Sequence, residues 1–156
     1  MATDTSTTPL GRTLRLLVWP AAIWIAYELL WYEQYKLTGN EGSVHLFTIL
    51  SDWLGTPGGE KPFRLFVAIM EIAAAALVLI PRTQAFGALF ALGIMSGAIF
   101  FHTVSPLGID PYGDGGRLFK EAVFTWLMAT LIVAVRRREL FGLARRVPVL
   151  RRLAPA

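Results

Sequence analysis

Four long apolar segments occupy most of this chain, and each contains an acid or a histidine toward the same end. The segments cover about 14–35, 63–80, 83–103 and 118–135, lengths that suit helices crossing a hydrocarbon layer. An ionised carboxylate at mid-membrane depth costs roughly 2.5 kcal/mol or more, so such residues usually face a bundle interior and serve a function. The shared depth predicts one polar site formed by Glu28, Glu71, His102 and Glu121.

The composition supports a membrane protein. Hydrophobic residues make up 54% of the chain and charged residues 17%, with a mean hydropathy of +0.52, which is too apolar for an ordinary soluble domain. We predict an all-α fold, an integral membrane four-helix bundle over residues 14–135. A cytoplasmic N-terminal segment, 1–13, precedes the bundle, and a basic cytoplasmic tail, 136–156, follows it.

Basic residues predict the orientation of these spans. Ten of the fifteen lysines and arginines lie in or beside the two terminal segments and the turn near Arg82, and the other five lie in the opposite connections or beside them. By the positive-inside rule, both termini face the cytoplasm and the protein is a multi-pass protein of the cytoplasmic (inner) membrane. The arginines of the tail are expected to contact anionic membrane lipid. No folded basic module accompanies them, which argues against nucleic acid as a partner.

The two connections on the other side of the membrane are predicted to be structured. Within 37–62, apolar residues recur at helical spacing from Val44 to Leu54, so we expect a short extracytoplasmic amphipathic helix over the mouth of the bundle. Ser43 is a suitable N-cap for it, and Gly55 is placed to end it. Four glycines and two prolines in 105–116 predict a compact loop on the same face.

The chain contains no cysteine. It therefore cannot ligate an iron–sulfur cluster through thiolates, attach haem covalently through a Cys-x-x-Cys-His motif, or exchange disulfides. Electrons that reach such a protein through sulfur or iron–sulfur chemistry must come from a partner.

Several segments resemble the DoxX-like family of bacterial and archaeal membrane proteins. The likeness covers roughly residues 14–135 and includes YKLTG after the first span, AIMEIAAAALVLIP in the second and GALFALGIMSGAIFFH in the third. Residue by residue it reaches Lys36, Glu71 and His102. The resemblance implies a four-helix membrane protein linked to quinone-dependent redox systems. Glu28, Glu33 and the segment HTVSPLGIDPYGDGG depart from the family pattern.

The polar cluster fits three interpretations. In the first, its role is structural: Glu71 is protonated or bonded to a neighbouring helix, His102 caps its span, and Glu121 pairs with Arg117 or Lys120. Local pairs between Glu33 and Lys36 and between Arg117 and Glu121 also follow from the spacing.

In the second interpretation, the cluster lines a pocket for a quinone or another small ligand. Glu71 and His102 then act as the proton-handling catalytic residues. The side chains predicted to hold the ligand are Glu28, Trp31, Tyr32, Glu121 and Trp126, with Phe101 and Phe124 as further aromatic candidates.

In the third interpretation, Glu28, Glu71, His102 and Glu121 bind a metal ion, with His45 as an additional ligand, since inward carboxylates and imidazoles hold metals in helix bundles. Haem held without covalent attachment by His45 and His102 is a further alternative. From the residues alone, the cofactor stays unassigned among quinone, metal and none.

Together these features favour a subunit of a quinone-linked membrane redox system with a polar pocket near the outer face. Redox proteins are the expected partners, and the small-residue faces of the middle spans are compatible with a homo-oligomer. A non-catalytic scaffold or assembly protein and a carboxylate/histidine metal-binding membrane protein are the alternatives. Whether the chain is an enzyme is left open by its sequence.

Overall fold

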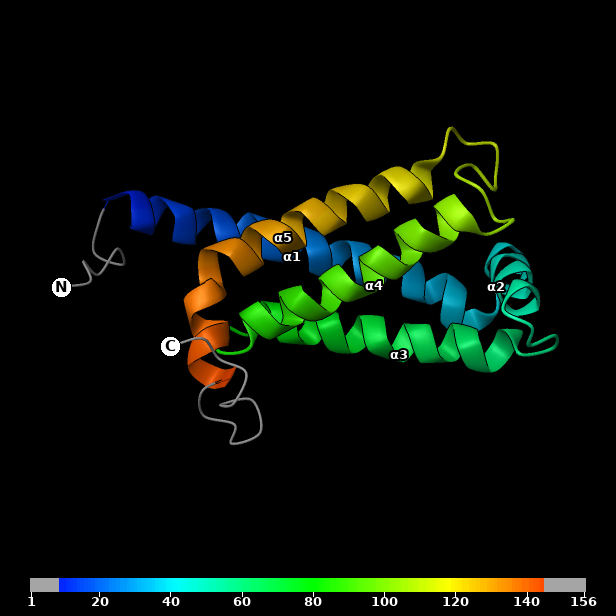
Figure 1. Cartoon of the computed structure of the whole chain (residues 1–156), viewed down its shortest axis with the longest axis horizontal. Coiled ribbons are helices and arrows are strands. Elements are labelled where there is room, and N and C mark those ends of the chain that lie inside the picture. The colour runs from blue at the N-terminus through cyan, green and yellow to red at the C-terminus, as the bar shows by residue number, and fades with distance from the viewer. Residues whose placement is uncertain (1–8, 145–156) are drawn as a thin grey trace.

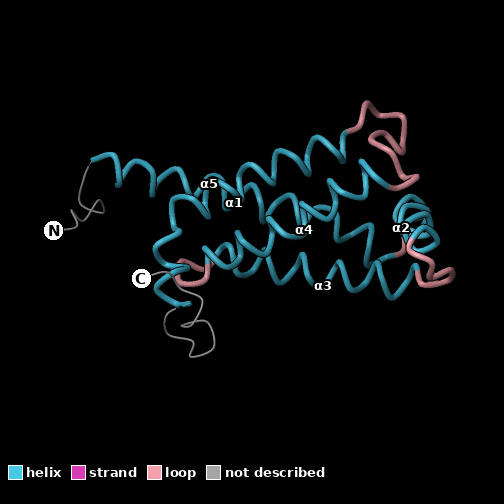
Figure 2. Tube along the Cα trace, viewed as in Figure 1, coloured by secondary structure: helices cyan, strands magenta, loops and turns pink. Residues whose placement is uncertain are grey.

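The computed structural model describes residues 9–144, and all regular structure within that range is helical (Figure 2). Its five helices are α1 (Pro9–Thr38), α2 (Glu41–Trp53), α3 (Glu60–Leu79), α4 (Gln84–Val104) and α5 (Arg117–Ala144). The all-α prediction is confirmed. The predicted terminal segments extend into residues 1–8 and 145–156, which lie outside the described residues.

Three of the described helices are long and apolar enough to cross a membrane: α3, α4 and the first 24 residues of α5. They correspond to the second, third and fourth predicted spans. This finding supports a membrane protein with transmembrane helices.

The four long helices lie side by side (Figure 1). The α1 helix packs against α3 and α5, and α4 packs against the same two helices. Both ends of the described chain lie with the α3–α4 turn at one end of the molecule, here named the terminal end. Helix α2 and the loop 105–116 lie at the opposite end, here named the α2 end.

Small side chains allow the helices to approach closely. The buried core includes alanines from all four long helices, together with Ile25, Leu29 and Ile132. Helices α3 and α4 are in close contact at Gly87 in α4, where a Cβ atom would lie 2.2 Å from the backbone nitrogen of Val78 in α3. Only a residue without a side chain fits at this crossing.

The start of α2 differs from the prediction, whereas its end agrees with it. Asn40, not Ser43, caps α2: its side-chain oxygen accepts a hydrogen bond of 3.0 Å from the backbone N–H of Gly42. Asparagine is as good an N-cap as serine, so two candidates three residues apart could not be separated by type alone. Gly55, directly after the α2 C-cap, has φ +75° and ends the helix as predicted.

Helix α5 continues nine residues past the predicted end of the fourth span, so the first part of the basic tail, 136–144, is helical. The final turns bend across the terminal end in Figure 1. Arg136 donates a hydrogen bond of 2.6 Å to the carbonyl oxygen of Pro81 and pairs with Glu139 at 3.2 Å. The contact with Pro81 fastens α5 to the α3–α4 turn.

Candidate functional site

A cavity of about 820 Å³ lies toward the α2 end and is lined by residues from all five helices. Its walls are largely apolar, with a few charged and polar side chains among them. Sites for small organic ligands have this composition and are roughly 300–1,000 Å³ in volume. The cavity is therefore of a suitable size and character for one small molecule.

Lys36, near the C-terminal end of α1, is the centre of the first polar cluster in the wall. Its Nζ atom pairs with Glu33 Oε1 at 3.1 Å and with Glu71 Oε2 on α3. All three side chains are largely buried, and the second oxygen of Glu33 has no hydrogen-bond partner. One cation thus faces two carboxylates, an arrangement that can store or release a proton.

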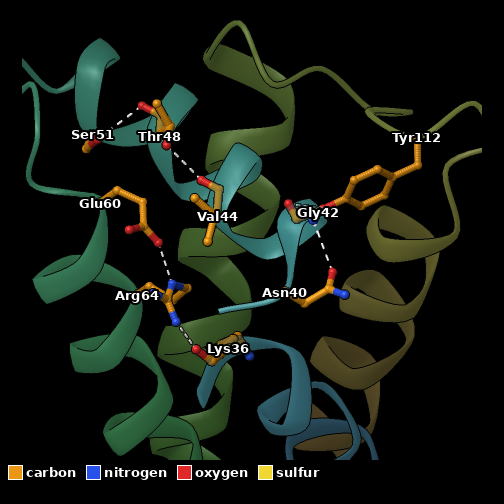
Figure 3. Close-up of polar contacts among 9 residues, drawn as sticks. All are labelled: Lys36, Asn40, Gly42, Val44, Thr48, Ser51, Glu60, Arg64 and Tyr112. Carbon is orange, nitrogen blue, oxygen red and sulfur yellow. Dashed lines mark hydrogen bonds and ion pairs between the residues drawn. The ribbon is translucent and has the colours of Figure 1, made fainter. Parts of the chain in front are cut away.

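Arg64 positions the end of α1 that carries Lys36. Its guanidinium donates to the carbonyl oxygen of Lys36 and also to the Glu60 carboxylate one turn earlier on α3 (Figure 3). Gly39, with φ +69°, lies directly beside the same guanidinium. Arg64 is 5% exposed, so it satisfies a helix-terminal carbonyl that is screened from water.

A second polar cluster joins α1 to α5. The Tyr32 hydroxyl donates to Glu121 Oε2, and the other oxygen of Glu121 accepts from Arg117 Nε at 2.8 Å. The buried Glu28, one turn before Tyr32 on α1, lines the same cavity. This side of the cavity can also hold a proton between oxygen atoms.

His102, in the last turn of α4, contributes an imidazole to the cavity wall. Its Nδ1 atom lies 2.7 Å from the carbonyl oxygen of Gly108. A carbonyl oxygen only accepts, so Nδ1 carries the hydrogen and a neutral ring has an unprotonated Nε2. The loop after α4 therefore selects the tautomer of His102.

Helix α2 and the loop 105–116 cover the α2 end of the cavity. The Tyr112 hydroxyl donates a hydrogen bond of 2.8 Å to the carbonyl oxygen of Gly42, which ties the loop to the first turn of α2 (Figure 3). Burial raises the pKa of Tyr112, and the nearby charge of Asp114 adds to the effect. The phenol therefore keeps its proton and remains a donor.

Asp110 organises the loop itself. Its carboxylate accepts hydrogen bonds from the backbone N–H groups of Asp114, at 2.9 Å, and Gly115, at 3.1 Å. Desolvation acts to raise the pKa of Asp110, but hydrogen bonding from the backbone of Gly116, Asp114 and Gly115 outweighs it and the pKa falls below its ordinary value.

Most of the site residues predicted from sequence meet at this cavity. Five of the seven line it: Glu28, Trp31, Tyr32, Glu71 and His102. Glu121 is connected to it through its hydrogen bond with Tyr32.

The remaining aromatic candidates divide between the cavity wall and helix contacts elsewhere. Trp126 is not part of the wall. Its indole N–H donates to Ser96 Oγ on α4 at 3.0 Å. Phe101 lines the cavity, whereas Phe124 packs edge-on against Trp24 with ring centroids 5.0 Å apart.

The arrangement does not favour the metal interpretation. Within residues 9–144, no three histidine, aspartate or glutamate side chains form a group that could hold a metal ion. Glu71 pairs with Lys36, and Glu121 bonds to Tyr32 and Arg117. His45, proposed as a metal or haem ligand, lies on α2 outside the cavity wall.

Sequence reasoning did not assign Lys36 and Arg64 to the site. The pairing of Lys36 with Glu33 was predicted and is present, but the cross-helix contact with Glu71 was not foreseen. A buried acid near the middle of one span and a lone lysine ending another are a signal that the two could meet. Nothing local in the sequence indicates that Arg64 reaches back to α1.

Comparison of the chain with protein-family models, curated proteins and solved structures found no significant match.

Proposed function

We propose that this chain is a DoxX-like, four-span protein of the inner membrane, with both termini in the cytoplasm. The three apolar helices support the last three spans, and α1 packs along α3 and α5 over a comparable length. Of the described basic residues, six belong to the terminal end and five to the α2 end, and the sequence has four further arginines after α5. The positive-inside rule therefore assigns the terminal end to the cytoplasm. In this orientation α2 lies on the extracytoplasmic side.

We further propose that the cavity binds the ring of a quinone and that the chain is a subunit of a membrane redox system. The observation that carries this proposal is the cavity itself: apolar walls of suitable volume that include a buried lysine–carboxylate cluster, a tyrosine and a histidine. A quinone requires two protons with two electrons when it is reduced. In this proposal a partner redox protein supplies the electrons.

Each polar group has a role in this proposal. The Lys36 ammonium donates a hydrogen bond to one ring oxygen. Glu71, which is bonded to the same ammonium, passes a proton to that oxygen when the quinone is reduced. When the ring is reduced, its second hydroxyl donates a hydrogen bond to the unprotonated Nε2 of His102, and the Tyr32–Glu121 pair can exchange a proton on the same side of the ring. Trp31 contributes an apolar surface beside them.

Equilibrium binding of a decyl benzoquinone to purified protein in nanodiscs tests the proposal. We expect saturable binding that is weakened at least tenfold, or about 1.4 kcal/mol, by Glu71→Gln. Glu41→Gln, the same chemical change at an exposed position of α2, is the matched control and should bind as the wild type does. Equal binding by the wild type and Glu71→Gln would refute the assignment of the site.

A non-catalytic scaffold is the second candidate, because both polar clusters join helices. Lys36–Glu71 connects α1 with α3, and Tyr32–Glu121 connects α1 with α5. If the acids only set the register of the helices, quinone binding is absent and Glu71→Gln changes stability alone.

A further inference from the structure

Helices α3 and α4 diverge from their connecting turn toward the α2 end, as Figure 1 shows. They touch at Gly87, where a Cβ atom would collide with the backbone of α3. At Gly93 and Gly97, the latter about 15 Å farther along the helix than Gly87, an added Cβ atom would meet nothing within 4 Å. The helices thus separate where α4 has glycines in place of side chains.

The space between the two helices belongs to the cavity described above. Gly93 and Gly97 line it from α4, and Phe66 and Met70 line it from α3. Two wall residues on this side, Phe66 and Leu89, are 58% and 47% exposed, so the cavity reaches the outer surface of the molecule here.

The surface where the cavity opens is formed by two of the helices that are apolar enough to span a membrane. The surrounding medium at this opening is then hydrocarbon, and the crevice is continuous with the lipid. From there the wall leads inward to Glu71 and Lys36 without leaving the cavity. A path runs from the lipid phase to a buried charged cluster.

We propose that the cavity takes a membrane-resident amphiphile with a single long chain, which enters sideways between α3 and α4. The polar head contacts the Lys36–Glu71 cluster, and the chain lies over Gly93 and Gly97. This inference rests on the proposed function and specifies its ligand as a long-chain quinone. A volume of about 820 Å³ suits a ring with one chain better than a phospholipid with two, since such cavities hold molecules of drug size.

The arrangement at the α2 end supports access from the side. Tyr112 fastens the loop 105–116 to α2, and Asn40 caps the same helix, so the cover of the cavity is held in place. The alkyl chain of the ligand can pass over the glycines of α4 without breaking either of these hydrogen bonds.

Photolabelling in nanodiscs tests the inference with two probes: a benzoquinone with a diazirine near the end of its decyl chain, and hexadecanol with the same diazirine. We expect both probes to form adducts on 66–70 and 89–97. The yield of these adducts should be at least about fivefold higher than the yield around the exposed Ile23 of α1, a ratio that corresponds to roughly 1 kcal/mol of preferential binding. Gly97→Leu should remove this excess. Ala76→Leu adds the same side chain at an exposed position of α3 outside the cavity wall and should preserve it.

Adducts spread evenly over the membrane-facing helices, or labelling unchanged by Gly97→Leu, would overturn the inference. Gly93→Leu provides a second variant at an equally open position should Gly97→Leu not fold. The two proposals fail in different ways. If quinone binding depends on Glu71 but the adducts lie elsewhere, lateral access is wrong; if hexadecanol labels the crevice and quinone does not bind, the redox function is wrong.

Discussion

Lys36 and Glu71 form an ion pair that joins α1 to α3 in a largely buried position, and Glu33 shares the same ammonium group. The pair stands 35 residues apart in sequence. Both residues line a cavity that is otherwise mostly apolar. Removing either partner should lower the stability of the protein, because a buried charge without its counter-charge is costly.

Replacement of Lys36 by methionine is expected to destabilise the protein by about 3–5 kcal/mol, since it leaves two buried carboxylates without a cation. The measurement is unfolding by sodium dodecyl sulfate in mixed micelles. Lys120→Met, at an exposed position of α5, is the control and should change stability little. The double variant Lys36→Met with Glu71→Met should recover part of the loss; a loss equal to the sum of the single effects would contradict the pairing.

Arg64→Met should cost about 1.5–3 kcal/mol, because the side chain donates to a carboxylate and to the otherwise unsatisfied Lys36 carbonyl. Lys61→Met, one turn away and exposed, is the comparison. We also expect weaker quinone binding in Arg64→Met, since the end of α1 that carries Lys36 is no longer held. Unchanged stability would show that the contact with Lys36 is not structurally important.

Tyr32→Phe removes the hydrogen bond to Glu121 while keeping the ring. We expect a loss of about 1.5 kcal/mol, the upper end of the range for hydrogen bonds between membrane helices, because the acceptor is charged. Tyr35→Phe, the same change one turn later on α1, should stay within about 0.5 kcal/mol of the wild type. Equal effects of the two substitutions in the same unfolding assay would argue against the Tyr32–Glu121 contact.

Alanine at two glycines of α4 should have opposite effects. Gly87→Ala places a Cβ atom 2.2 Å from the Val78 nitrogen and should cost about 1–3 kcal/mol as α3 and α4 are forced apart. Gly93→Ala meets open space and should stabilise α4 by up to about 1 kcal/mol through helix propensity. Thermal unfolding followed by circular dichroism measures the Tm of both variants. A Tm that rises in both variants, or falls in both, would contradict the described contact between α3 and α4.

Asp110 should make the loop 105–116 sensitive to acid. Its pKa is lowered in the folded protein, so its stabilising contribution is complete above the ordinary value of about 3.9 and is lost as pH falls through the lowered pKa. The difference in Tm between the wild type and Asp110→Ala should therefore be constant near neutral pH and shrink in acid. A Tm difference that grows on acidification would show that the pKa of Asp110 is not lowered in the folded protein.

Local features could be predicted from the sequence because they depend on spacing along one helix. Apolar runs of membrane length indicated the helices, and the period of apolar residues after Ser43 indicated α2. The Glu33–Lys36 and Arg117–Glu121 pairs followed from the three- and four-residue spacing of neighbours on a helix surface. Gly55 ended α2 because glycine readily adopts positive φ.

Contacts between helices could not be predicted in this way. Whether Lys36 meets Glu71, or Tyr32 meets Glu121, depends on how far each helix is rotated and shifted along its neighbour, and no local pattern contains these quantities. They are decided by packing, above all where Gly87 lets α4 touch α3 and so sets the angle at which the two helices separate. The sequence alone thus determined the helices and the charged residues within them, whereas the tertiary structure decided which charges pair and that a cavity opens between α3 and α4.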